Sequence, residues 1–223
     1  MMSEAVAASR NAADRLAAVT MPSQIAALKR DPRGYPIPKF VQTVPTLDFR
    51  VLDARHMRRC VDSKICWICG GRLGRGLTAV IGPMCAVNRI SSEPPSHLDC
   101  ARYAARVCPF LAIPEMRRND HNLPPHAHMA GIGLPRNPGV TLLWRMDHYR
   151  LSRPPGGGVL FELGEPTKTE WYREGRPATR AEVLQSLAEG IPALAELAAR
   201  DGQQAVWELG KAFKRALAYV PAA

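Results

Sequence analysis

Six cysteines and six histidines are the residues of this 223-residue chain whose types and spacing could bind a metal. Cys66 and Cys69 form a C-x-x-C pair followed by two glycines, so two thiolates on a tight turn could point at one tetrahedral zinc ion. His97 and Cys100 are three residues apart, which places them on one face of the first turn of a helix. Together the four residues predict a Cys3His zinc site. Such a site has no open coordination position, so we expect zinc (Zn) to have a structural role.

The other cysteines leave alternatives open. Cys85 could replace His97 as the fourth ligand, and a second zinc could use His56, Cys60, Cys85 and Cys108, although buried structural thiols are the simpler interpretation. A redox pair also has C-x-x-C spacing, but no thioredoxin-like βαβ pattern surrounds this one. The N-terminus lacks the apolar centre of a secretory signal, so we expect a cytoplasmic protein with reduced cysteines.

The ligands are positioned by a knuckle, a predicted hairpin and a predicted helix, in this order along the chain. The apolar run 77–81 and the Gly82-Pro83 turn predict a β-hairpin within 73–88, and Ser96 is a good N-cap for a helix over 97–107. A knuckle, a hairpin and a ligand-bearing helix resemble the treble-clef zinc finger over about residues 64–108. The resemblance implies Cys66, Cys69, His97 and Cys100 as ligands.

Breaker-rich stretches divide the rest of the chain. We expect five segments: an N-terminal helical segment (1–30), a Pro-rich and basic linker (31–63), the zinc-finger unit (64–110), an irregular His/Pro-rich loop (111–138), and a sheet with C-terminal helices (139–223).

The last segment carries strand and helix signals. We predict three strands, at 141–146, 159–163 and 167–172, with the 154–158 turn between the first two. Thr179 and Glu182 form a capping box for a helix that ends near Gly190. A second helix has Pro192 in its first turn, and a third spans 201–219. The predicted class is α+β: a treble-clef-like finger plus a small antiparallel sheet packed with C-terminal helices.

The charge of the chain favours a polyanionic partner. Thirty basic residues, 24 of them Arg, face 20 acidic ones, giving +10 and a pI near 9.7. Most of the excess lies in residues 1–125, so we expect phosphate contacts there to bind DNA or RNA, although a merely solubilising surface would look the same. The candidate nucleic-acid-binding residues are Arg50, Arg55, Arg58, Arg59, Arg72, Arg75, Arg102 and Arg106. No apolar stretch is long enough to span a membrane.

The leading hypothesis is a zinc-stabilised nucleic-acid-binding accessory protein without catalytic residues. A protein-interaction module, such as a phage-encoded inhibitor or adaptor that uses the nearly neutral residues 126–223, is the alternative. A third hypothesis is a metal-dependent nuclease, because His121, His126 and His128 on a chain with a treble clef are similar to the His-Asn-His endonucleases. Those enzymes carry their histidines on the finger itself, whereas here the cluster follows it.

Four short motifs extend the comparison to the whole chain. Cys-Trp-Ile-Cys-Gly, Ile-Gly-Pro-Met-Cys, Cys-Pro-Phe-Leu and Gly-Arg-Pro-Ala-Thr-Arg-Ala-Glu-Val together resemble uncharacterised proteins of bacterial phages and prophages. This resemblance implies a bacterial or phage origin and no assigned activity.

Overall fold

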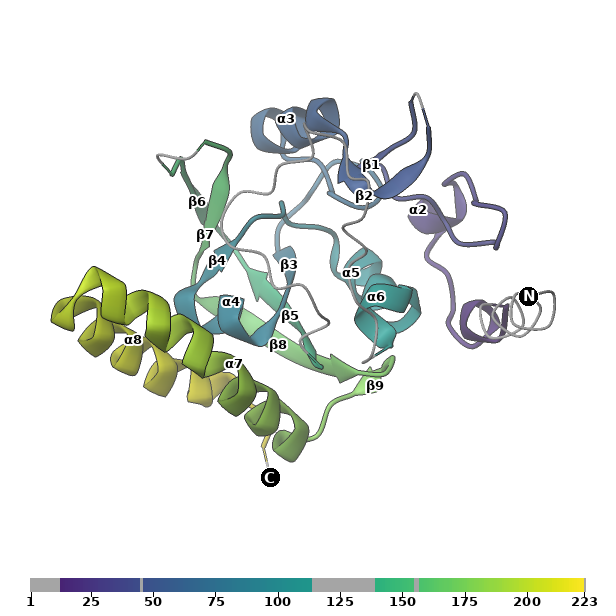
Figure 1. Cartoon of the computed structure of the whole chain (residues 1–223). Coiled ribbons are helices and arrows are strands. Elements are labelled where there is room, and N and C mark those ends of the chain that lie inside the picture. The colour runs from purple at the N-terminus through teal and green to yellow at the C-terminus, as the bar shows by residue number, and fades with distance from the viewer. Residues whose placement is uncertain (1–12, 45, 114–138, 155–156, 223) are drawn as a thin grey trace.

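The computed structural model describes residues 13–44, 46–113, 139–154 and 157–222 (Figure 1). Helices and antiparallel strands are mixed along the chain, which confirms the expected α+β class. Residues 13–17 are helical. The elements that follow are α2 (Ser23–Ala26), β1 (Val41–Gln42), β2 (Asp48–Leu52), α3 (Ala54–Ser63), β3 (Leu77–Ile81), α4 (Pro83–Asn88), β4 (Ile90–Ser91), α5 (Leu98–Val107), α6 (Pro109–Ala112), β5 (Thr141–Met146), β6 (Tyr149–Ser152), β7 (Leu160–Leu163), β8 (Pro166–Arg173), β9 (Arg176–Pro177), α7 (Arg180–Asp201), α8 (Gln203–Ala216) and the 3-10 turn η1 (Leu217–Tyr219).

The largest sheet joins the middle of the chain to its C-terminal part. Its strand order is β3-β5-β8-β9, and β5 pairs with β3 from Leu77↔Met146 to Ile81↔Leu142. We expected the sheet to be confined to 139–223. Because β3 belongs to the predicted finger unit, that unit and the C-terminal segment share one sheet.

Helices cover both faces of this sheet. On β5, Leu142, Trp144 and Met146 lie in the core cluster with α4, α7 and α8, whereas Leu143 packs with Ala101 and Ala105 of α5. This alternation is the period of two expected for a strand with both faces buried. The sheet is therefore the middle of three layers, with the α7-α8 pair on the outside (Figure 1).

A second, smaller sheet has the order β4-β7-β6. The three predicted strands are all present, as β5, β7 and β8, but they do not form one three-stranded sheet. The 154–158 segment connects β6 to β7, and β6 is a strand that we did not predict. The short β6 carries the alternation Tyr-Arg-Leu-Ser, which is too brief a signal to stand out from a loop.

Residues 83–88 form α4 and not the second strand of a hairpin. Gly82 is the N-cap in an extended conformation and Pro83 occupies the first turn, a position where its missing N–H is not needed. The Gly-Pro dipeptide thus starts a helix here. The hairpin that the treble-clef resemblance requires is replaced by a strand, a helix and the short β4.

Helix α7 is continuous from Arg180 to Asp201, so the predicted break near Gly190 is wrong. The capping box of Thr179 and Glu182 is present at its start, as predicted. A Cβ on Gly190 would lie 2.8 Å from the Met84 Cε, so this glycine permits close packing of α7 on α4. Packing against α4 and α8 outweighs the helix-breaking tendency of Pro192 in its interior.

Residues 31–63, which we expected to be a linker, contain β1, β2 and α3. Asp53 caps α3 by accepting hydrogen bonds from the N–H groups of Arg55 and His56. A second core cluster joins Ile25 and Tyr35 to the two buried cysteines Cys66 and Cys100. Apolar residues between Leu16 and Phe40 therefore pack onto the predicted metal site.

Within the described parts of the chain, every helix is too short or too polar to cross a bilayer.

Candidate metal centre

The C-x-x-C pair lies at the tip of a tight turn. Ile65 and Arg72 form an antiparallel bridge, the Cys66 N–H donates to the Gly71 carbonyl at 2.7 Å, and the Gly70 N–H donates to the Cys66 carbonyl at 2.9 Å. Gly70 has φ +76°, a conformation that favours glycine. We call residues 64–73 the knuckle. Its geometry follows from local sequence, which is why the spacing could predict it.

The second pair comes from the start of α5. The bridge between Thr78 and Ser96 fixes the chain that enters this helix. His97 is the N-cap, whereas we expected Ser96 there, and Cys100 lies in the first turn. The His97 side chain makes no capping hydrogen bond, so its imidazole is available to the knuckle.

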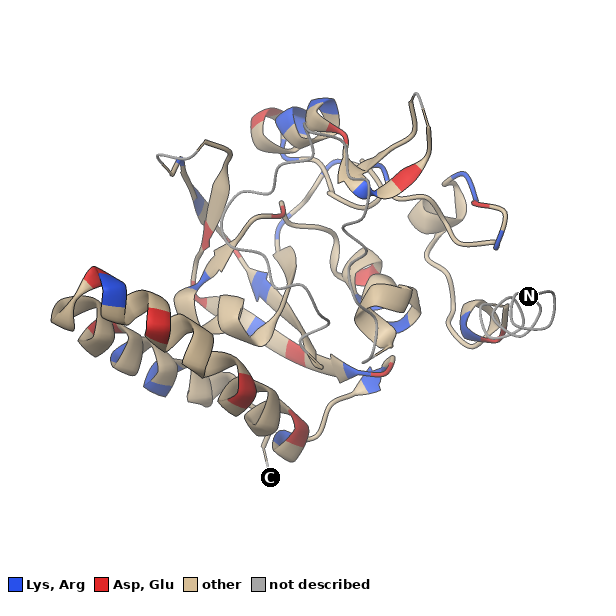
Figure 2. Ribbon diagram, viewed as in Figure 1, with Lys and Arg blue, Asp and Glu red and all other residues tan. Residues whose placement is uncertain are grey.

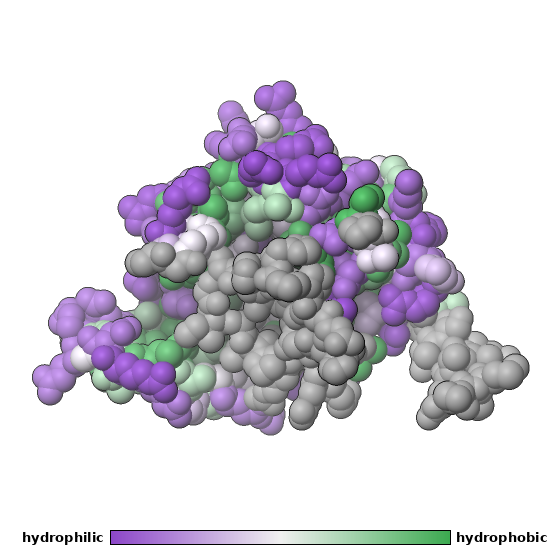
Figure 3. Space-filling view, turned by 45° about the horizontal axis from the view of Figure 1, so that its top comes forward, coloured by the Kyte–Doolittle hydropathy of each residue, from purple (hydrophilic) through white to green (hydrophobic). Residues whose placement is uncertain are grey.

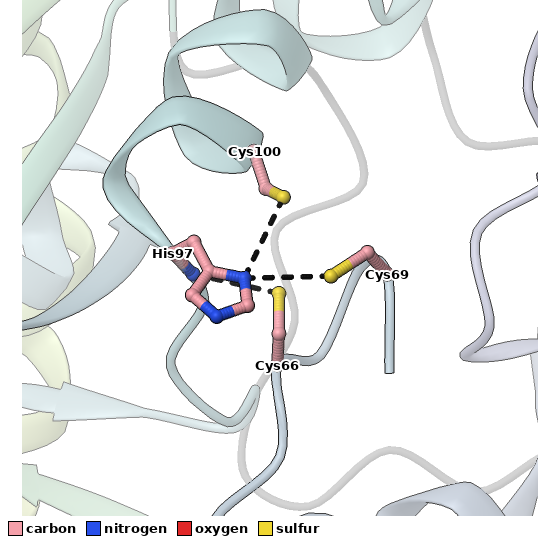
Figure 4. A group of neighbouring side chains, drawn as sticks. All are labelled: Cys66, Cys69, His97 and Cys100. Carbon is pink, nitrogen blue, oxygen red and sulfur yellow. Dashed lines mark hydrogen bonds between the residues drawn. The ribbon is translucent and has the colours of Figure 1, made fainter. Parts of the chain in front are cut away.

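The four predicted ligands converge (Figure 4). Their candidate ligand atoms all lie within 4.8 Å of one another. The His97 Nδ1 is 3.4 Å from the Cys69 Sγ and 3.8 Å from the Cys100 Sγ. A tetrahedral zinc with bonds of about 2.3 Å to sulfur and 2.0 Å to nitrogen would set S···N separations of about 3.5 Å. The cluster therefore has the dimensions of a site that could hold a metal ion.

A backbone contact orients the imidazole. The His97 Nε2 is 2.9 Å from the Arg72 carbonyl oxygen, to which it can donate only in the tautomer that leaves a lone pair on Nδ1. That lone pair faces the three sulfurs. A hydrogen bond of this kind is the usual support of a metal-bound histidine, because it fixes ring orientation and increases basicity.

The knuckle glycines support the sulfurs. The Gly71 N–H points at the Cys69 Sγ at 3.4 Å, and a Cβ on Gly71 would lie 3.4 Å from both that sulfur and the His97 Cε1. The His97 N–H donates to the Cys66 Sγ at 3.4 Å. N–H groups aimed at sulfur stabilise the thiolate form, which is the form that binds metals.

The sulfurs also interact with one another. The Cys100 and Cys69 thiols hydrogen-bond to Cys66 and so hold the pKa of Cys66 well below its usual range. The same hydrogen bonds, together with burial, raise the pKa of Cys100. Without a cation the group therefore stabilises one thiolate at the expense of another. A bound metal ion would remove this conflict by stabilising all three thiolates.

Four protein donors leave no coordination position for water. Cys66 and Cys100 are fully buried, and Cys69 and His97 are partly buried. The chemistry of such a closed site is to stabilise the fold and not to activate a substrate.

The cysteines outside this cluster do not form a second one. Among the described residues, the cluster at the knuckle is the only group of three or more His, Cys, Asp or Glu side chains that could hold a metal ion. Burial raises the pKa of Cys60 to about 12 and that of Cys85 to about 11, so both thiols stay protonated at neutral pH. Cys85 does not replace His97.

A feature that the sequence reasoning missed is the brace between α3 and the knuckle. The His56 Nε2 lies 2.9 Å from the Trp67 carbonyl oxygen, and the His56 ring stacks on the Trp67 indole at 5.5 Å. Phe40 also stacks on Trp67, at 4.9 Å. Burial lowers the pKa of His56 and keeps its ring neutral. The available signal was the i, i+4 spacing of His56 and Cys60, which marks the buried face of α3.

The structure divides the eight predicted arginines into two groups. Arg50 pairs with Asp48 at 2.8 Å, Arg102 pairs with Glu170 at 2.5 Å, and Arg55 lies 3.6 Å from Asp53. Arg106 is exposed and donates to the Gly175 carbonyl. The others are exposed and have no ion pair with a described residue: Arg58, Arg59, Arg72 and Arg75.

The histidines of the nuclease hypothesis, His121, His126 and His128, lie outside the described residues. His148, farther along the chain, is exposed, and its ring packs over Gly164.

Comparisons with protein-family models, curated proteins and solved structures find no match to this chain. The resemblance to phage and prophage proteins therefore stays a prediction.

Proposed function

We propose that this chain is a nucleic-acid-binding accessory protein whose fold is stabilised by one structural zinc ion. The observation that carries the proposal is the arginine-rich outer face of α3, which the His56–Trp67 brace fixes to the knuckle.

The donor set supports zinc as the metal. Three thiolates and one imidazole are soft and borderline ligands, which suit zinc and do not suit magnesium or calcium. The ligands would be Cys66, Cys69, His97 and Cys100. Metal analysis of the purified protein should find about one zinc per chain, and Cys100→Ser should lose most of it.

The arginines of α3 form one surface. Arg55, Arg58 and Arg59 occupy helical positions i, i+3 and i+4, and all three are exposed, whereas His56 and Cys60 are buried on the opposite face. Basic residues colour much of α3 blue in Figure 2. Guanidinium groups bind phosphate oxygens in a fork that lysine cannot reproduce. We call this surface the α3 arginine face.

Two more arginines are exposed, Arg72 in the knuckle and Arg75 just beyond it. Arg50 and Arg102 are excluded from the proposed surface because carboxylates already hold them, and Arg106 is excluded because it donates to the Gly175 carbonyl. The proposed binding surface is therefore smaller than the sequence indicated, and it lies on α3 and the knuckle without the ligand-bearing helix α5.

Charge-neutralising variants test this surface. Arg58→Gln, Arg59→Gln and Arg72→Gln together should weaken binding to DNA and RNA in a titration. Each lost phosphate contact should reduce the slope of log K against log salt by about 0.7–0.9, so the triple variant should lose about 2–3. The control triple is Arg150→Gln, Arg200→Gln and Arg215→Gln, which removes the same charge from exposed positions elsewhere. Equal binding by the two triples would refute the α3 arginine face.

A second candidate is a protein-interaction module. Val206 and Trp207 are exposed next to each other on α8, by 48% and 57%. Tryptophan is enriched among the residues that dominate protein interfaces. If the titration shows no salt-sensitive binding to any nucleic acid, this candidate becomes the better one.

A further inference from the structure

The hairpin of β1 and β2 has an apolar end that is partly exposed to solvent. Val41 and Val51 are buried at its base. Farther out, Val44 is 70% exposed, Leu47 40% and Phe49 38%. Phe49 and Val51 lie on the same face of β2, because side chains alternate along a strand. The core face of the hairpin thus continues past the core into solvent. We call Val44, Leu47 and Phe49 the hairpin tip.

One arginine lies beside the hairpin tip. The Arg33 guanidinium lies 5.8 Å from the centroid of the Phe49 ring and 5.4 Å from that of Tyr35. Arg33 also pairs with Asp31, but its side chain is 60% exposed. Asp31 is buried and holds the Arg33 guanidinium at 2.7 Å, so the phosphate contacts are expected from the α3 arginine face and not from Arg33.

The hairpin tip and the α3 arginine face lie at the same end of the molecule. β2 runs through Asp53 directly into α3, and Leu52 packs in one cluster with Met57 and Cys60 of that helix. In Figure 1 both elements stand at the top of the molecule. In Figure 3 this end is mostly hydrophilic, with hydrophobic surface on the side of the hairpin. Apolar and phosphate-binding side chains are therefore available to one ligand.

We propose that the hairpin tip contacts unstacked bases, so that the protein binds single-stranded or distorted nucleic acid in preference to intact duplex. This inference rests on the proposed nucleic-acid binding. Every base has an apolar face on which an aromatic ring can stack, and proteins that bind single strands combine such rings with a positively charged surface. An intact duplex buries those faces and presents phosphates and groove edges instead.

An anionic membrane would also attract arginine beside apolar residues. The hairpin tip is too small to anchor a protein there. Three partly exposed side chains offer less apolar surface than one myristoyl chain, which by itself gives only marginal membrane binding. Arginine forks and a phenylalanine ring fit a phosphate backbone and its bases better.

The test compares Phe49→Ser with a matched control, Trp207→Ser. Trp207 is 57% exposed on α8, away from the hairpin (Figure 1), so the control removes an exposed aromatic side chain without touching the hairpin tip. Binding is measured by fluorescence anisotropy with a labelled 20-nucleotide single strand and the same sequence as a duplex. We expect Phe49→Ser to weaken single-strand binding at least about fivefold, with duplex binding within about twofold and an unchanged salt slope. Trp207→Ser should match the wild type.

A second measurement does not depend on the stability of Phe49→Ser. A single strand with 2-aminopurine should change its fluorescence when wild-type protein binds, and Phe49→Leu, which keeps an apolar residue at the site, should reduce the change. Equal wild-type affinity for strand and duplex, together with a silent Phe49→Ser, would overturn the base contact and leave the phosphate contacts standing. Absence of binding to either at low salt would overturn the proposed function as well. Co-sedimentation with phosphatidylserine vesicles that Phe49→Ser abolishes, with strand binding intact, would assign the hairpin tip to lipid and also overturn the inference.

Discussion

Replacing Gly70 with alanine tests whether the shape of the knuckle sets the metal affinity. Gly70 has φ +76°, and its N–H closes the turn by donating to the Cys66 carbonyl at 2.9 Å. Alanine at this φ costs about 1–2 kcal/mol because its Cβ approaches the backbone carbonyl. The new Cβ would also lie 3.2 Å from the Lys39 Cγ, but that exposed side chain can move.

The cost should appear in zinc binding. The knuckle brings Cys66 and Cys69 to the metal only when the turn is closed, so the strain reduces the free energy of metal binding. A cost of about 1–2 kcal/mol corresponds to a roughly 5- to 30-fold weaker affinity. Competition with a colorimetric chelator would measure it.

Gly74→Ala is the control for this substitution. Gly74 lies one residue beyond the knuckle, and a Cβ there would meet no atom within 4 Å. The affinity of Gly74→Ala for zinc should match that of the wild type. Equal affinities for Gly70→Ala and Gly74→Ala would refute the argument that the left-handed turn positions the ligands.

Three further results are expected. Removing the metal with a strong chelator should speed hydrogen exchange at the knuckle and the first turn of α5, while β5, buried on both faces, stays protected; equal exchange with and without metal would contradict a structural site. The hydrogen bond from Arg102 lowers the pKa of Glu170 from 4.5 to about 2, so this pair contributes stability above pH 4.5 that is lost as the pH falls toward 2. The free energies of unfolding of wild type and Glu170→Gln, measured with urea, should therefore differ by about 1–2 kcal/mol at pH 7 and converge at low pH. A difference independent of pH would refute the pairing. Thr179→Ala should cost about 1 kcal/mol in the same urea assay because the N3 amide of α7 loses its acceptor, and an unchanged midpoint would mean that the capping box contributes nothing.

Local features of this chain could be predicted from its sequence. The knuckle and the start of α5 depend on spacings of three residues, and the capping box of α7 depends on Thr179 and Glu182. Each of these is decided by residues within one turn of each other, so tertiary packing had little to change. Strands β5, β7 and β8 were also predicted, because each is a short continuous run of strand-forming residues.

Features that depend on distant partners could not be predicted. β3 pairs with β5, about 60 residues later, so the sequence around Gly82 does not reveal that the strand has a partner elsewhere. Arg102 is neutralised by Glu170, which lies 68 residues away, and no pattern near Arg102 indicates this. Gly190 looked like a helix end because its packing against Met84 is visible only in three dimensions.

The pairing of β3 with β5 has a consequence for the order in which parts of the protein fold during synthesis. The four residues of the metal cluster lie within 66–100, so the cluster can assemble soon after this stretch leaves the ribosome. β3 must then wait for β5, whose last residue, Met146, is synthesised about 3–13 s after Ile81 at about 5–20 residues per second. During that interval Leu-Thr-Ala-Val-Ile has an unpaired edge, which is a template for association between nascent chains. Early capture of a metal ion would fix Ser96 against Thr78 on the other edge of the strand, so that only the edge that awaits β5 stays open.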